Sequence, residues 1–143
     1  MATQTATDAE TIQLVVFALG EEQYALPIER VQEIIRFTEP RSITSTDPSV
    51  RGVISLRGKI IPICDLTSRL GCRGGGGHDG NIIIVDTDEQ PVGIIVDDVN
   101  EVTTINRAQV DPLPTETESL IDGIAKLDDR LVILLNPDRT AHA

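Results

Sequence analysis

The stretch Arg51-Gly-Val-Ile-Ser-Leu-Arg-Gly-Lys-Ile-Ile-Pro-Ile-Cys-Asp-Leu66 decides the fold of this chain. Two apolar runs, Val53 to Leu56 and Ile60 to Cys64, flank a charged turn at Arg57-Gly58-Lys59. β-Branched residues favour strands, and Gly58 can supply the positive φ that a short hairpin turn needs, so the stretch predicts a β-hairpin. Pro62 has no N–H to donate to a ladder, which predicts an edge strand or a bulge, and an exposed edge at the end of this hairpin.

The same pattern returns in the last part of the chain. Gly123 to Asn136 aligns without a gap with Gly52 to Asp65, at an offset of 71 residues. A second match, at an offset of 67 to 68 residues, sets Val99 and Glu101 against Val31 and Glu33. Chance similarity among apolar strands is the alternative, but two ordered matches at nearly one offset favour a duplication.

We therefore expect a single domain over residues 11–140, made of two similar halves at about 11–71 and 81–140. A disordered tail over residues 1–10 precedes them, and a glycine-rich linker over residues 72–80 joins them. Consecutive glycine amides can also cradle a phosphate, but here an apolar strand follows the glycines rather than a helix that begins with Lys-Ser/Thr. A flexible linker is the favoured interpretation.

Composition and charge exclude several classes of partner. The 143 residues carry a net charge of −11, which would repel nucleic acid and anionic lipid surfaces, and only 2% of them are aromatic. No apolar run approaches the ~20 residues that cross a bilayer, and the start has no signal-peptide pattern. We expect a cytoplasmic protein without direct membrane insertion, with Cys64 and Cys72 reduced.

Strand patterns dominate the chain, with one exception. Ile28, Val31, Ile34 and Ile35 recur at helical spacing after Pro27, which predicts one amphipathic helix. Short helical turns are expected at residues 66–70 and 106–110. The chain is therefore predicted to be mainly β, with two small barrels that are each made largely of one half.

Catalytic and metal sites have little support. Asp86 with Asp88, Asp97-Asp98 and Asp128-Asp129 could hold a cation or transfer protons, but all lie at predicted strand ends or turns, where aspartate favours local hydrogen bonds. His78 lies in the linker and His142 near the end, so no nucleophile and base can be paired. We expect no catalytic residue, no metal and no cofactor.

Arg57 and Glu33 are candidates for binding a partner. The repeat sets Arg57 against Asp128, so the sign of the charge changes at one turn between otherwise similar halves, and folding alone does not require that change. Both residues being ordinary solvated charges is the alternative, and it stays open.

Gly52-Val-Ile-Ser-Leu-Arg-Gly-Lys-Ile-Ile-Pro-Ile-Cys-Asp-Leu66 resembles the hallmark segment of the CheW family of bacterial chemotaxis coupling proteins, G-V-x-N-L-R-G-x-x-x-P-x-x-D-L. Ser55 stands where the family usually has Asn, and Gly74 to Gly77 look like an insertion. The resemblance covers essentially Ile12 to Arg139. Its other landmarks follow in order at Val31-Gln-Glu-Ile34, Val92-Gly-Ile-Ile-Val-Asp97 with Val99 to Val102, and Ile121-Asp-Gly-Ile-Ala-Lys-Leu-Asp-Asp-Arg-Leu131.

This resemblance implies two SH3-like β-barrels and a non-enzymatic adaptor in signal transduction. Members of the family bridge the tips of chemoreceptors, the methyl-accepting chemotaxis proteins, and the regulatory domain of a histidine kinase. They bind the receptor in a groove between the subdomains and the kinase mainly through the second subdomain. Carried over by motif, the receptor-side residues are Val31, Glu33, Gly52 and Arg57.

Two other functions stay open. One is a small acidic β-barrel enzyme or metal-dependent hydrolase that uses an Asp pair, and the other is an adaptor domain detached from a larger kinase or phosphoacceptor protein. The polar ends of the chain favour a stand-alone protein.

Overall fold

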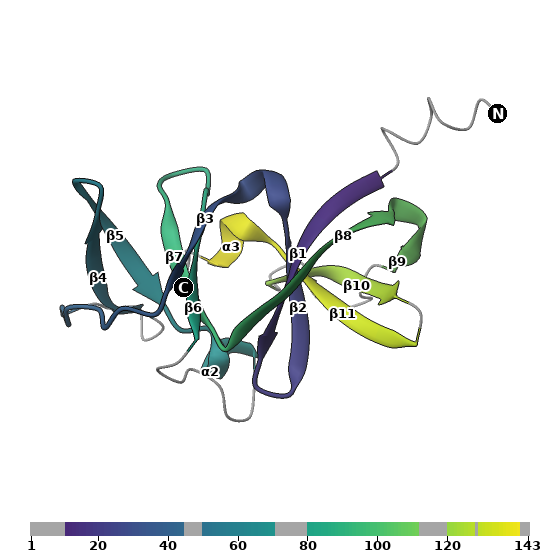
Figure 1. Cartoon of the computed structure of the whole chain (residues 1–143), viewed down its shortest axis with the longest axis horizontal. Coiled ribbons are helices and arrows are strands. Elements are labelled where there is room, and N and C mark those ends of the chain that lie inside the picture. Colours follow the sequence, from purple (N-terminus) through teal and green to yellow (C-terminus); the bar gives the residue numbers. More distant parts are fainter. Residues whose placement is uncertain (1–10, 45–49, 71–79, 112–119, 128, 141–143) are drawn as a thin grey trace.

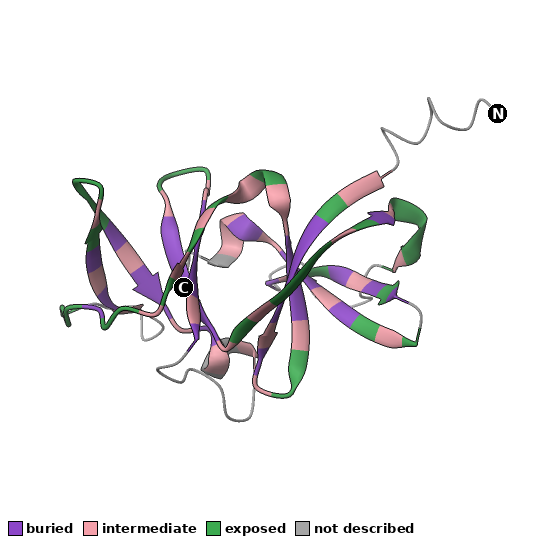
Figure 2. Ribbon diagram, viewed as in Figure 1, coloured by how far each residue is buried: buried purple, intermediate pink, exposed green. Residues whose placement is uncertain are grey.

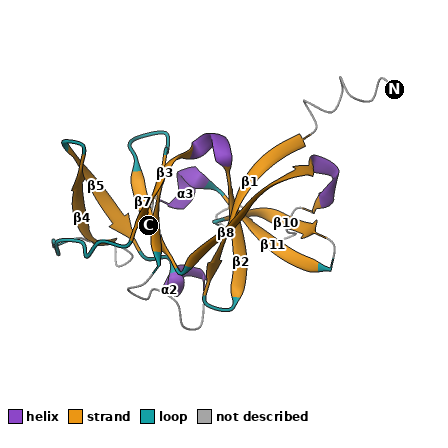
Figure 3. Cartoon of the chain, viewed as in Figure 1, coloured by secondary structure: helices purple, strands orange, loops and turns teal. Residues whose placement is uncertain are grey.

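The computed structural model describes residues 11–44, 50–70, 80–111, 120–127 and 129–140, and these residues are mainly in strands (Figure 1; Figure 3). The predicted tail, the linker up to residue 79, and Asp128 lie outside the described residues. The strands are β1 (Thr11–Leu19), β2 (Glu22–Pro27), β3 (Val31–Arg36), β4 (Val50–Leu56), β5 (Lys59–Cys64), β6 (Asn81–Val85), β7 (Val92–Val96), β8 (Asp98–Asn106), β9 (Val110–Asp111), β10 (Ile121–Leu127) and β11 (Arg130–Leu135). Helical structure in the described residues is limited to the 3-10 turns η1 (Ile28–Arg30) and η2 (Arg107–Gln109) and the short helices α2 (Thr67–Leu70) and α3 (Pro137–Thr140). Within the described part of the chain, no helix has the length and apolarity to span a bilayer.

The predicted hairpin is confirmed as β4 and β5, which pair antiparallel around a two-residue turn. Arg57 and Gly58 occupy the turn with φ values of +52° and +81°. Two successive left-handed residues suit the twist of a tight hairpin, and glycine takes that conformation without steric cost. Arg57 is therefore held in a conformation that a side chain seldom adopts.

Pro62 lies neither on an edge strand nor at a bulge, because β5 runs between β4 and β7 and the register shift of the hairpin falls between Val50 and Gly52. The hairpin does end at an edge of the sheet, as predicted, but the edge strand is β4. Pro62 lies opposite Val53, whose N–H and C=O both bond Arg41 on the other side, at 3.0 and 2.8 Å. The Val53 and Pro62 pair therefore exchanges no hydrogen bond. Pairing with β7 begins only at Ile63, so an inner strand tolerates a residue without an N–H.

Each half of the chain contributes strands to both sheets. The six-stranded sheet has the order β8-β1-β2-β11-β10-β9, and the five-stranded sheet has the order β3-β6-β7-β5-β4 (Figure 1). The β1–β2 hairpin thus lies beside strands of the second half, and the β6–β7 hairpin lies beside strands of the first. The five-stranded sheet takes most of its strands from the first half, and the six-stranded sheet takes most of its strands from the second. The division into two halves joined by a linker at residues 72–80 stays a prediction. Closure of either sheet into an SH3-like barrel stays a prediction.

The two sheets nevertheless correspond strand for strand. In each, a hairpin from one half is inserted between the third strand and the last hairpin of the other half. The isolated bridge between Arg41 and Val53 in one sheet matches the pairing of Asp111 with Ile124 in the other.

The predicted amphipathic helix after Pro27 is wrong. Only Ile28–Arg30 form a 3-10 turn, and Val31–Arg36 form β3, which pairs antiparallel with β6. Burial alternates residue by residue along β3. Val31 and Ile35 lie on the partly buried face of the strand, whereas Ile34 lies on the exposed face. The apolar spacing therefore suits a helix better than this strand, and pairing with β6, in which Ile82 to Val85 are buried, outweighs it.

The buried residues, coloured purple along the strands in Figure 2, include three apolar clusters. The central cluster joins both sheets, and its members include Phe17 and Leu26 from one sheet and Ile83 and Ile94 from the other. The second cluster lies within the six-stranded sheet and includes Leu14, Val16, Ala25, Val132 and Leu134. The third cluster lies within the five-stranded sheet and consists of Ile54, Ile61, Ile63, Ile82, Ile84 and Ile95. Side chains alternate along the strands, so one face of a strand contributes to the central cluster and the other face to the cluster within its own sheet.

Candidate functional site

Glu33 and Arg57 form an ion pair at the surface of the five-stranded sheet. Arg57 Nη2 donates to Glu33 Oε1 at 2.7 Å, and Arg57 Nε donates to Glu33 Oε2 at 3.1 Å. The hydrogen bond and the charge of Glu33 raise the pKa of Arg57, so the guanidinium stays charged. A two-point bond fixes its plane as well as its position.

This ion pair connects the two edges of the sheet. Glu33 belongs to β3, one edge strand, and Arg57 lies in the turn that joins β5 to β4, the other edge strand. Ile35 and Leu56, close in sequence to the two charged residues, pack against the third cluster. The pair therefore lies at the rim of that cluster, with the Arg57 side chain 71% exposed and that of Glu33 26% exposed.

Gly52 is required by a close approach of two backbone segments. Its φ is +155°, and a Cβ built on it would lie 2.2 Å from the carbonyl oxygen of Arg41. Any side chain would push away the segment that bonds β4 at its edge. Its partner in the repeat, Gly123, is crowded in the same way, with a Cβ position 2.9 Å from the carbonyl oxygen of Asp111.

Val31 points to a different part of the molecule from Glu33. It is half-buried and packs against the central cluster, and the ladder with β6 shifts register between Val31 and Glu33. Four residues are receptor-side candidates from sequence motifs. The structure brings Glu33 and Arg57 into contact and places Gly52 in β4, the strand that ends directly before Arg57. It turns Val31 toward the junction of the two sheets.

The second half contains a matching ion pair that sequence alignment missed. Arg130 bonds Glu101 through Nη2, and its Nη1 donates to Gln23 Oε1 at 3.1 Å. Glu101 is the repeat partner of Glu33, but Arg130 is the partner of Lys59 rather than of Arg57. The guanidinium has moved two residues along the hairpin turn, so a comparison position by position shows only a change of sign.

Two of the acidic residues accept hydrogen bonds from segments that are distant in sequence. Asp97 Oδ2 accepts a hydrogen bond from the Gly20 amide at 2.8 Å, and Asp86 Oδ1 accepts one from Gln32 Nε2 at 2.5 Å. Among the described residues, no group of three His, Cys, Asp or Glu side chains is placed to hold a metal ion. Cys64 is buried, whereas His78, Cys72 and His142 lie outside the described residues.

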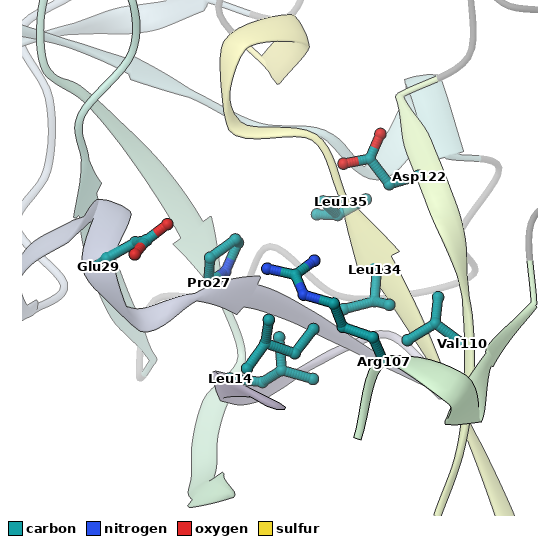
Figure 4. Close-up of a pocket in the computed structure, with 9 residues that line it drawn as sticks. Leu14, Pro27, Glu29, Arg107, Val110, Asp122, Leu134 and Leu135 are labelled. Atoms are coloured by element: carbon teal, nitrogen blue, oxygen red, sulfur yellow. The ribbon is translucent and has the colours of Figure 1, made fainter. Parts of the chain in front are cut away.

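A pocket of about 420 Å³ lies in the six-stranded sheet, beside η1 and η2 (Figure 4). Arg107 extends over an apolar floor that includes Leu14 and Leu134, with Glu29 and Asp122 on either side (Figure 4). Arg107 forms no ion pair within the part of the chain that the structure describes. No sequence pattern indicated this pocket, because its lining residues are scattered from the first strand to the last.

Known proteins with the same organisation identify the family. The family model described as the CheW-like domain matches residues 13–143. The chain belongs to the CheW-like family. The chemotaxis protein CheW of Klebsiella aerogenes is 31% identical over 146 residues, which cover 97% of this chain and 88% of that protein. The CheW of Helicobacter pylori is 31% identical over 130 residues, with coverage of 88% and 79%.

The fold of this CheW-like chain is also found in a solved structure. The crystal structure of the scaffolding protein TtCheW from Thermoanaerobacter tengcongensis superposes with a TM-score of 0.84 at 38% identity, and covers 92% of this chain and 93% of that one. The predicted family and the predominance of strands are therefore confirmed. The chain is a chemotaxis coupling adaptor, and the solved relative is a scaffolding protein.

Proposed function

We propose that this chain bridges the tips of chemoreceptors and the regulatory domain of a chemotaxis histidine kinase, and that it does so in the cytoplasm without catalysing a reaction. Family membership supports the adaptor role. The receptor side consists of Val31, Glu33, Gly52 and Arg57, and the single observation that carries this assignment is the two-point bond between Glu33 and Arg57.

Arg57 supplies the group that a partner can recognise. A guanidinium has five N–H donors, and Glu33 engages only the Nε atom and one donor of Nη2. The remaining donors lie on a side chain that is 71% exposed and already oriented. Holding a charged side chain in place before binding reduces the entropy that association costs. Glu33 therefore orients Arg57 toward carbonyl or carboxylate oxygens of the receptor.

Gly52 and Val31 act through the backbone and the core. Gly52 lets the Arg41 segment lie against β4, which shapes the surface beside the turn. Val31 links β3 to the central cluster between the sheets. A substitution at Gly52 thus disturbs receptor binding by displacing neighbouring backbone rather than by losing a contact of its own.

The enzyme alternative has no comparable support. Asp86 and Asp97 already accept hydrogen bonds that hold turns and strand ends. A carboxylate that is engaged in this way is a poor candidate for a proton-transfer or metal site.

Reconstitution tests the proposal. Membranes that contain chemoreceptors are mixed with the kinase, with and without the purified chain, and kinase autophosphorylation and co-sedimentation are measured. We expect the chain to sediment with receptor and kinase together and to raise receptor-dependent kinase activity. A folded chain that sediments with neither partner would refute the proposal, and Arg57→Ala serves as the matched variant.

A further inference from the structure

The start of β3 is bonded to the residue that directly follows β6 in the five-stranded sheet. The Asp86 amide donates to the carbonyl oxygen of Arg30 at 2.7 Å, and Arg30 Nε donates back to the carbonyl oxygen of Asp86 at 3.1 Å. Arg30 directly precedes Val31. The β3 ladder shifts register between Val31 and Glu33, so regular pairing alone does not fix the backbone there.

Asp138 holds the other end of the Arg30 side chain. Arg30 Nη2 forms an ion pair with Asp138 Oδ1, and the same oxygen accepts the Asp88 amide at 2.9 Å. One carboxylate thus joins the entrance of β3 to the turn between β6 and β7. The two side chains are only 28% and 32% exposed, which shields the pair more than a fully solvated surface pair.

Asp138 is itself fixed to the six-stranded sheet. It lies in α3, which begins two residues after the end of β11. Asn136 Oδ1 accepts the Asp138 amide at 2.9 Å, and the Asn136 amide bonds the carbonyl oxygen of Leu120 at 2.8 Å. The carboxylate therefore connects an end of one sheet to the receptor-side strand of the other, 108 residues away from Arg30 in sequence.

We propose that Asp138 is a positioning residue for the receptor side: through Arg30 it holds the irregular start of β3, so that Val31 and Glu33 are presented in the geometry that the receptor requires. This inference rests on the proposed function. Arg30 transmits the constraint because its guanidinium bonds Asp86 and Asp138 at once, which a lysine ammonium on a flexible stem cannot reproduce in the same geometry.

The test compares Asp138→Asn with Asp111→Asn. Asp111 is paired with Lys126 at 3.2 Å on β9 and β10 and has no bond to β3, so its change removes the same charge at a remote place. Hydrogen exchange of the Val31 to Glu33 amides, the affinity for a soluble receptor-tip fragment, and the affinity for the kinase regulatory domain are measured on both variants. Arg30→Lys is the second variant.

For Asp138→Asn we expect exchange at Val31 to Glu33 to rise by about tenfold and receptor affinity to fall by about threefold to tenfold, with kinase affinity within about twofold. Arg30→Lys should act in the same direction, and Asp111→Asn should change none of the three. Unchanged exchange in Asp138→Asn, an equal loss of both partners, or the same effect from Asp111→Asn would overturn the proposal. If the unaltered chain binds no receptor fragment, the proposed function fails, and the exchange data alone then decide whether Asp138 positions β3.

Discussion

Arg130 bonds Glu101 in the six-stranded sheet as Arg57 bonds Glu33 in the five-stranded sheet, although the repeat aligns Arg57 with Asp128. Each guanidinium group connects the last hairpin of one half to the third strand of the same half. The charge difference between Arg57 and Asp128 suggested that Arg57 binds a partner. A structural role in joining sheet edges therefore explains part of that difference. Receptor binding is the added role that we propose for Arg57.

Arg57→Ala and Arg57→Gly should leave the fold intact and impair coupling. The side chain is largely solvated, so we expect the melting temperature to stay within about 3 °C of the unaltered protein. Glycine also suits the left-handed turn at this position, and Arg57→Gly therefore separates loss of the guanidinium from backbone strain. Receptor affinity, measured by titration with a receptor-tip fragment, should fall by about tenfold or more in both variants. Full receptor-dependent kinase activation by either variant would show that Arg57 is an ordinary surface residue.

Arg130→Ala distinguishes an edge-joining role from a receptor-binding role. It removes the equivalent ion pair and the bond to Gln23, but it lies in the other sheet. We expect a small change in melting temperature, within about 3 °C, and receptor affinity within about twofold of the unaltered protein. Equal losses of receptor affinity in Arg130→Ala and Arg57→Ala would mean that closing the sheet edges, not contact with the receptor, explains both.

Gly52→Ala should destabilise the protein by about 2 kcal/mol or more, because the new Cβ would lie 2.2 Å from the Arg41 carbonyl oxygen. Gly58→Ala is the matched control, since Gly58 also has a positive φ but has no atom within 4 Å of its Cβ position. Its cost should be about 1 kcal/mol, from backbone strain alone. Urea unfolding of the two variants measures the difference, and equal costs would show that the Arg41 segment moves aside freely.

Asp138 should contribute stability that depends on pH. Partial burial by itself raises the pKa of Asp138, but hydrogen bonds from Arg30 and from the Asp88 amide favour its charged form, and the net effect lowers the pKa below the ordinary value of 3.8. A lowered pKa in the folded state gives stability that is present above the unfolded value and is lost as the pH falls through the folded value.

The unfolding free energies of the unaltered protein and of Asp138→Asn should therefore differ most at pH 6, and the difference should shrink below about pH 4. Urea titrations at several pH values measure it. Asp88→Asn is the matched control, because it removes a neighbouring carboxylate and keeps the amide that bonds Asp138. A difference that stays constant from pH 6 to pH 3 would contradict the assignment.

The sequence by itself determined the strands, the hairpin turn and the family. Alternating β-branched residues and Gly58 are local signals, because strand preference and a positive φ depend on the residue and its immediate neighbours. The motif that contains Gly52 and Arg57 is likewise contiguous, and the family that it indicated is confirmed. Most elements could therefore be predicted from local patterns. The exceptions are Val31 to Arg36, which was expected to be a helix, and the short elements β9 and α3, which no local pattern indicated.

Only the tertiary structure decided how these elements combine. Val31 to Arg36 form a strand because the buried strand β6 pairs with them. The halves exchange hairpins, and each sheet is completed by strands from the other half. The bonds from Arg57 to Glu33, from Arg130 to Glu101 and from Arg30 to Asp138 join residues between 24 and 108 positions apart. No local pattern encodes such pairs, since burial, pairing and charge contact are properties of distant segments brought together by folding.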